Sequence, residues 1–185
     1  GLAVQSCASS RPAAGAEHQF SHLWDIQGHT YQGEAPSHGF KVGIGTLASV
    51  ALYERILEKG TDAWQVEEIL AAWPDRDTLV KRARNMHPNE NLVAVAEREV
   101  AAKYIARNDL RKRLEYLQEI WPDLQAQLQQ QLLPVRDLRQ MLQAVGAPVE
   151  PEVIGIERDR LRVSYTLAQT IRRRYTVLDL AFESG

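Results

Sequence analysis

The sequence predicts an all-α protein, and three observations lead to that fold class. Segment after segment places apolar residues at helical spacing, between a capping residue and a closing glycine or proline. No stretch alternates apolar and polar residues over a useful length, so no β-strand is expected. The 185 residues are 44% hydrophobic and 25% charged, which suits one globular domain with a buried core. We therefore expect one bundle-like helical domain over residues 1–185.

The boundaries of the expected helices follow from local signals. The break at SSRP (9–12) arises because proline disfavours helix at the residue before it. Ser37 is suited to cap a helix that starts at His38, and Gly60 is suited to end it. In chain order the expected helices cover 1–9, 14–26, 38–59, 61–73, 75–85, 91–106, 134–145 and 158–175, and TVLDLAFESG forms a short closing piece.

Between residues 110 and 128, leucine and tryptophan residues recur at alternating spacings of four and three and form a seam along one helix face. The seam consists of Leu110, Leu114, Leu117, Trp121, Leu124 and Leu128. This pattern is typical of a coiled coil. Pro122 falls inside it, however, and proline is best tolerated in the first turn of a helix. We therefore expect two helices, or one kinked helix, packed into the core of the domain.

Composition excludes several classes of protein. A net charge of −2 gives no global indication of nucleic acid or of a membrane surface as a partner. The longest uncharged run, 42–53, is shorter than the roughly 20 apolar residues that a bilayer requires, and the N-terminus lacks the basic region of a signal peptide. The single cysteine, Cys7, excludes a disulfide framework, and we expect a reducing, cytoplasmic location. No phosphate-binding glycine loop is present.

The histidines form the main chemical motif. In GAEHQFSHLWD, His18 and His22 are four residues apart and share one helical face. His38 starts the next helix, and a hairpin would return it to His18. Two histidines leave a divalent metal under-coordinated, because catalytic sites normally have three protein ligands. Gln19 stands where a metalloprotease motif needs glutamate, so the sequence argues against that class of enzyme. Surface histidines and a metal site both remain open, and the candidate third ligands are His22, Glu17, Asp25, His29 and Glu34.

Three segments, SRPAAGAEHQFSHLWD, APSHGFKVGIGTLAS and IRRRYTVLDLAFESG, carry a family resemblance. They resemble the iron-containing alcohol dehydrogenase superfamily, and within it the sn-glycerol-1-phosphate dehydrogenase group. The likeness covers essentially the whole chain. It implies that the chain corresponds to the all-helical C-terminal domain, similar to that of dehydroquinate synthase, and that the N-terminal NAD(P)-binding domain is absent from it.

The resemblance also implies a set of functional residues. His18 and His38 correspond to metal ligands, with zinc expected and iron or nickel as alternatives, and His22 corresponds to a position lining the substrate and nicotinamide side of the cleft. The third ligand of the family is an aspartate upstream of this segment. The implied reaction is hydride transfer between glycerol 1-phosphate and dihydroxyacetone phosphate, and the chain alone is expected to be inactive.

Other functional expectations concern the substrate phosphate and the partners. Ser10, Arg11, Ser37 and Lys41 lie beside the histidine motif and are our candidates for binding the phosphate. A homo-oligomer is expected, as is contact with the missing nucleotide domain. We interpret His29 as an exposed loop residue and His87 as a turn residue. A phosphate or nucleic-acid face and a solvated helix face are the two interpretations of Arg172, Arg173 and Arg174, with Arg158, Arg160 and Arg162, and we favour the solvated face.

Rival interpretations remain at this point. The chain would otherwise be a stand-alone helical module that binds metal or mediates oligomerisation, without dehydrogenase activity. Within the enzyme class, a relative of glycerol dehydrogenase or of 3-dehydroquinate synthase is the alternative. A purely structural helical bundle without metal is the third possibility.

Overall fold

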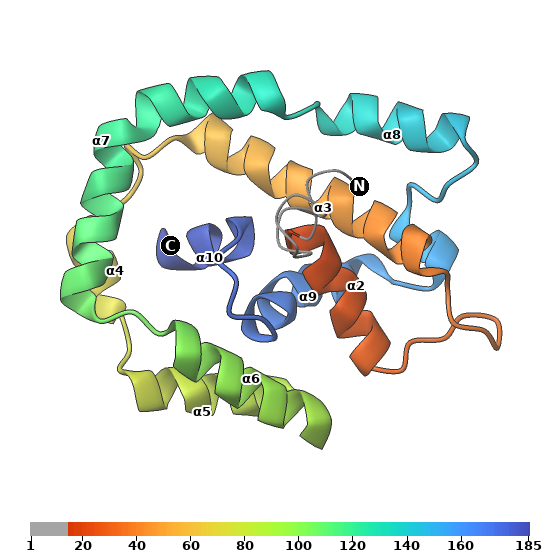
Figure 1. The fold of residues 1–185 in the computed structure, drawn as a ribbon, viewed down its shortest axis with the longest axis horizontal. Coiled ribbons are helices and arrows are strands. Elements are labelled where there is room, and N and C mark those ends of the chain that lie inside the picture. The colour runs from red at the N-terminus through yellow and green to blue at the C-terminus, as the bar shows by residue number, and fades with distance from the viewer. Residues whose placement is uncertain (1–14) are drawn as a thin grey trace, which may run out of the picture.

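The computed structural model describes residues 15–185 and is helical, as Figure 1 shows. A single isolated bridge between Tyr31 and Glu34 is the extent of β-structure in that range, so the all-α fold class is confirmed. None of the helices in residues 15–185 combines the length and the apolar character that a bilayer crossing requires. The elements are α2 (Ala16–Ile26), α3 (His38–Lys59), α4 (Val66–Ala72), α5 (Arg76–Met86), α6 (Glu90–Lys103), α7 (Arg107–Gln131), α8 (Val135–Ala144), the 3-10 helix η2 (Pro151–Ile154), α9 (Arg158–Thr170) and α10 (Val177–Glu183).

The boundaries of α3 agree with the sequence signals. The Ser37 hydroxyl accepts a hydrogen bond of 3.2 Å from the backbone N–H of Phe40, as an N-cap does. At the other end Gly60 has a φ of 64°, in the region that favours glycine, and its N–H donates to the carbonyl of Ile56. The expected helix 1–9, its break at 9–12 and Cys7 lie outside the described residues.

Two expected helices are shorter than predicted. The segment 61–73 starts as a turn, in which the N–H of Trp64 donates to the carbonyl of Thr61, and the helix begins only at Val66. The predicted helix 158–175 ends at Thr170, because the following residues instead bond to α2, α6 and α10. The helix η2 was not expected.

The seam at 110–128 forms one bent helix, which was one of the two alternatives. Pro122 lies inside α7, and Figure 1 shows α7 turning sharply partway along its length. A proline inside a helix removes one hydrogen bond and kinks the axis. Leu110, Leu114 and Trp121 of the seam are buried, so the seam belongs to the core, as predicted.

Two hydrophobic clusters hold the described helices together. The larger one joins α2, α3, α9 and α10 around Phe20, Trp24 and Ile171, which are all fully buried. The smaller one joins α4, α5, α6 and the first half of α7. In Figure 1 α2, α9 and α10 occupy the centre, with α3 above them and the α5–α6 pair below. The larger cluster therefore fixes α2, which carries the histidine motif.

Two histidines outside the motif are buried, which corrects the prediction that His29 is exposed. Its Nε2–H donates to the carbonyl of Ile154 at 2.7 Å, and Arg160 donates to its Nδ1 at 2.8 Å. His87 follows α5 in a short connection, as expected of a turn residue, but it is also buried. Its Nε2 lies 2.7 Å from the hydroxyl of Thr170. The sequence did not indicate either contact, because both partners lie more than 80 residues away.

Candidate metal centre

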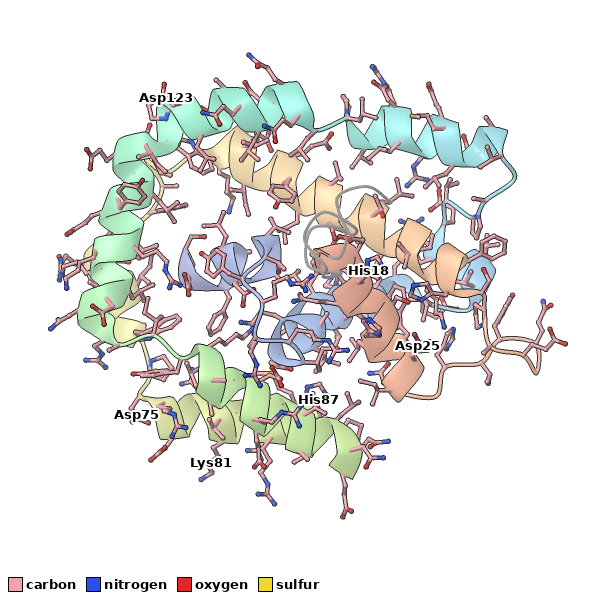
Figure 2. All side chains as sticks on the ribbon, viewed as in Figure 1. His18, Asp25, Asp75, Lys81, His87 and Asp123 are labelled. Atoms are coloured by element: carbon pink, nitrogen blue, oxygen red, sulfur yellow. The ribbon has the colours of Figure 1, made fainter. Side chains whose placement is uncertain are left out.

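The hairpin of α2 and α3 brings three histidine rings together. The ring centroids of His18 and His38 are 5.5 Å apart, and His22 lies 6.3 Å from each of them. The contact needs both the four-residue spacing on α2 and the position of His38 in the first turn of α3. Figure 2 places His18 near the start of α2 and Asp25 near its end.

The His18–His38 separation suits a shared metal ion better than either distance to His22. Metal–nitrogen bonds of about 2 Å in a tetrahedral site put two imidazole centroids roughly 5 Å apart. The observed 5.5 Å for His18 and His38 is close to that value, whereas 6.3 Å for His22 exceeds it by more than 1 Å. The geometry therefore separates one pair of rings from a third ring beside it.

Side chains of α2 orient both rings of this pair. Nδ1–H of His18 donates to the carboxylate of Glu17 at 2.9 Å, and the same carboxylate accepts the backbone N–H of Gly15 at 2.7 Å. Nδ1 of His38 lies at hydrogen-bonding distance, 3.1 Å, from the hydroxyl of Ser21. Partners of this kind at one ring nitrogen direct the other nitrogen, Nε2, toward a metal. Neither Nε2 atom bonds to any residue in the described range.

The third ring, His22, is kept neutral by its surroundings. Burial lowers its pKa below the usual 6.5, and the positive charge of Arg172 lowers it further, while Asp25 opposes the shift. A neutral imidazole retains a lone pair that accepts a proton or binds a metal. His22 is therefore chemically available at neutral pH.

A complete ligand set is not assembled among residues 15–185, where no group of three or more histidine, cysteine, aspartate or glutamate side chains is arranged to hold a metal ion. The nearby carboxylates already have partners: Glu17 binds His18, and Asp25 pairs with the ammonium group of Lys41. Both ring nitrogens of His29 are hydrogen bonded, and Glu34 is exposed in the loop. Among these candidates the two carboxylates of α2 thus already have partners, and the rings supply imidazole nitrogens alone.

The structure gives two of the candidate phosphate residues other contacts. Lys41 is buried and pairs with Asp25, so its charge is already compensated. Ser37 caps α3. Ser10 and Arg11 lie outside the described residues. Within residues 15–185, neither Lys41 nor Ser37 is brought to the histidine rings by an observed contact.

One cation near the rings was not among the candidate phosphate residues. Arg172 lies close enough to His22 to influence its protonation, in the segment after α9 that was interpreted as a solvated helix face. That interpretation was wrong for this segment, because the helix ends at Thr170 and Arg173 binds Glu99 of α6 at 2.9 and 3.2 Å. A signal existed: no acidic residue lies within six positions of Arg172 in the sequence.

Comparison with known proteins identifies relatives of the chain. A glycerol-1-phosphate dehydrogenase (NAD(P)+) of Geobacillus stearothermophilus is 27% identical over 179 residues, which cover 96% of this chain and 35% of the relative. The enzyme of the same name from Halalkalibacterium halodurans is 40% identical over 67 residues, covering 36% of this chain and 17% of the relative. That from Korarchaeum cryptofilum is 37% identical over 91 residues, covering 47% and 29%.

No protein-family model matches the chain, and no solved structure matches it. The chain spans about a third of the length of the Geobacillus relative, and its match falls in the C-terminal part of such proteins. The resemblance drawn from the three sequence segments is confirmed, because these relatives, from bacteria and archaea, are named glycerol-1-phosphate dehydrogenases.

Proposed function

We propose that this chain is the metal- and substrate-binding helical domain of an NAD(P)-dependent polyol-phosphate dehydrogenase. Its substrates are glycerol 1-phosphate and dihydroxyacetone phosphate. The nucleotide-binding domain belongs to a part of the protein outside these 185 residues. The observation that carries the proposal is the pair of oriented rings, His18 and His38, at 5.5 Å. The names of the relatives support the substrate class, and the one from Geobacillus stearothermophilus matches 96% of this chain.

His18 and His38 are the proposed metal ligands of this domain. Both have a partner at Nδ1 within the α2–α3 hairpin, which leaves Nε2 for the metal. A divalent ion held there, zinc in the first instance and otherwise iron or nickel, supplies Lewis-acid polarisation of the substrate oxygen. The third ligand is a carboxylate from outside this chain, which agrees with the engaged state of Glu17 and Asp25.

His22 is the proposed catalytic residue of this chain. Its neutral imidazole lies beside the ligand pair and is not needed to orient either ring. A ring nitrogen of His22 can therefore take up a proton from the substrate hydroxyl and return it in the reverse reaction. The nicotinamide cofactor, NAD or NADP, is bound by the nucleotide domain. Homo-oligomerisation and a cytoplasmic location remain predictions.

Zinc binding tests this proposal directly on the 185-residue chain. We expect titration calorimetry and elemental analysis to find about one zinc ion per chain. The variants His18→Ala and His38→Ala should each weaken zinc binding at least tenfold, because each removes one ligand.

The matched control is His87→Gln, whose amide keeps a donor toward Thr170. It should bind zinc as the wild type does, with circular dichroism confirming that all variants remain helical. Zinc binding that survives in both ligand variants, or that is absent from the folded wild type, would count against the site in this chain.

A further inference from the structure

The segment between α9 and α10 is fixed against α2 beside the histidine rings. The side-chain amide of Gln19 donates to the carbonyl of Arg174 at 3.5 Å, and the hydroxyl of Thr176 donates to the carbonyl oxygen of that amide at 3.3 Å. Gln19 immediately follows His18 and lies one turn before His22. These bonds hold Arg174 and Thr176 against α2 within one turn of the two histidines.

The neighbours of Arg172 are anchored on both sides. Ile171 is fully buried in the main core, and Arg173 turns to α6, where it binds Glu99 through two nitrogens. The backbone at 172 is therefore held in place from both directions. A guanidinium on such a backbone loses less freedom when it binds a ligand than one on a mobile loop.

Arg172 carries an uncompensated charge in the described part of the chain. No carboxylate in residues 15–185 forms an ion pair with it, although most of the other arginines that follow residue 150 do pair with one: Arg158, Arg162 and Arg173. Arg172 is also only partly exposed. A half-buried guanidinium that is not neutralised within the fold suits an anionic group, and its planar fork matches two oxygens of a phosphate.

We propose that Arg172 is the residue of this chain that binds the substrate phosphate and so selects a phosphorylated polyol over a free one. This inference rests on the proposed function and names the phosphate subsite within it. It assigns the role to Arg172 in place of Lys41, whose ammonium already pairs with Asp25.

Binding measurements on the zinc-loaded 185-residue chain test the assignment. Calorimetric titrations with glycerol 1-phosphate, inorganic phosphate and glycerol are made on wild type, Arg172→Gln and Arg172→Lys. We expect Arg172→Gln to weaken the binding of glycerol 1-phosphate and of phosphate by about tenfold to a hundredfold, since a charge-assisted pair is lost. Arg172→Lys should recover part of that loss, because it restores the charge without the fork.

The affinity for zinc and the affinity for glycerol serve as internal controls. Neither should change in the Arg172 variants, because neither involves the phosphate. Arg162→Gln is the matched control for charge: its side chain is 83% exposed on α9, and phosphate affinity should stay within twofold of wild type.

The outcomes separate this inference from the proposed function. Equal affinity of wild type and Arg172→Gln for glycerol 1-phosphate overturns the assignment, and so does a wild type that binds neither phosphate compound. If zinc binds as proposed but phosphate binding is unchanged in Arg172→Gln, this inference is overturned and the proposed function stands. Loss of phosphate binding in Arg172→Gln, in a chain that binds no zinc, supports the phosphate subsite and removes the metal assignment.

Discussion

Gly45 of α3 lies against the backbone of Glu17 of α2, so closely that a Cβ at position 45 would stand 2.6 Å from the Glu17 carbonyl oxygen and 3.1 Å from its Cα. Glu17 precedes His18 and orients its ring. The close approach of the two helices at this point therefore sets how near His18 can come to His38 on α3.

Gly45→Ala is expected to destabilise the protein and to disturb the histidine pair. The added methyl group meets backbone atoms, which cannot move aside as a side-chain end can, so α2 and α3 must separate. We expect a loss of about 1–3 kcal/mol in the free energy of unfolding and weaker zinc binding, measured by urea denaturation and calorimetry.

Gly43→Ala in the same helix is the control for that change. Its nearest neighbour would be a side-chain carbon of Leu142 at 3.9 Å, an ordinary contact. Alanine there should stabilise α3 by about 0.5–1 kcal/mol, because glycine is a poor helix former. An unaltered zinc affinity in Gly45→Ala would contradict the role we give to the close approach.

Gly155→Ala is expected to loosen the loop that joins α2 and α3. Gly155 has a φ of 74°, and a Cβ there would lie 2.4 Å from the ring of Tyr31. Backbone strain and the steric clash should together cost about 2–4 kcal/mol in the free energy of unfolding.

The comparison for Gly155 is Gly146→Ala, which has a similar φ of 71° and open space around the added atom. Gly146→Ala should lose only the cost of the backbone strain, about 1 kcal/mol in the free energy of unfolding. The difference between the two variants measures the contact with Tyr31, and equal losses in thermal or urea unfolding would show that this contact does not matter.

Glu99 is expected to make stability fall at acid pH. Hydrogen bonds from Arg173, and then from Arg98, lower the pKa of this carboxyl from 4.5 to about 2, against the opposing effect of burial. Because the unfolded chain binds the proton more readily, the stabilisation is present above about pH 5 and is lost as the pH falls toward 2.

Glu99→Gln should remove this part of the pH dependence. We expect it to cost about 1–3 kcal/mol at pH 7 and to differ less and less from wild type between pH 5 and pH 2, measured by urea denaturation at each pH. Glu97→Gln breaks the more exposed pair with Arg84 and should cost less than 1 kcal/mol. A difference that stays constant with pH would contradict the assignment to Glu99.

The 185-residue chain by itself is expected to have no dehydrogenase activity. Zinc-loaded protein with glycerol 1-phosphate and NAD+ or NADP+ should give no change in absorbance at the nicotinamide band above a protein-free blank. The reason is that the nucleotide domain and the carboxylate ligand lie, on our proposal, outside this chain. Turnover that is abolished by His18→Ala would refute that expectation.

Local sequence information was sufficient for most of the helices and for the histidine motif. Capping and stop signals act within a few residues, and Ser37 and Gly60 accordingly mark α3 correctly. The four-residue spacing of His18 and His22 likewise places both on one face without any tertiary information. The kink in α7 follows from the covalent structure of Pro122 alone.

Tertiary structure decided which polar groups are free to act. The sequence suggested Lys41 as a phosphate ligand, but its ammonium group pairs with Asp25, 16 residues away. It suggested that His29 is exposed, but this ring accepts a hydrogen bond from Arg160, 131 residues away. Arg172 comes near His22 only because α9 stops and its continuation packs on α2. Such pairings depend on how the helices cross, and a local pattern carries no information about a partner that the chain reaches only after folding.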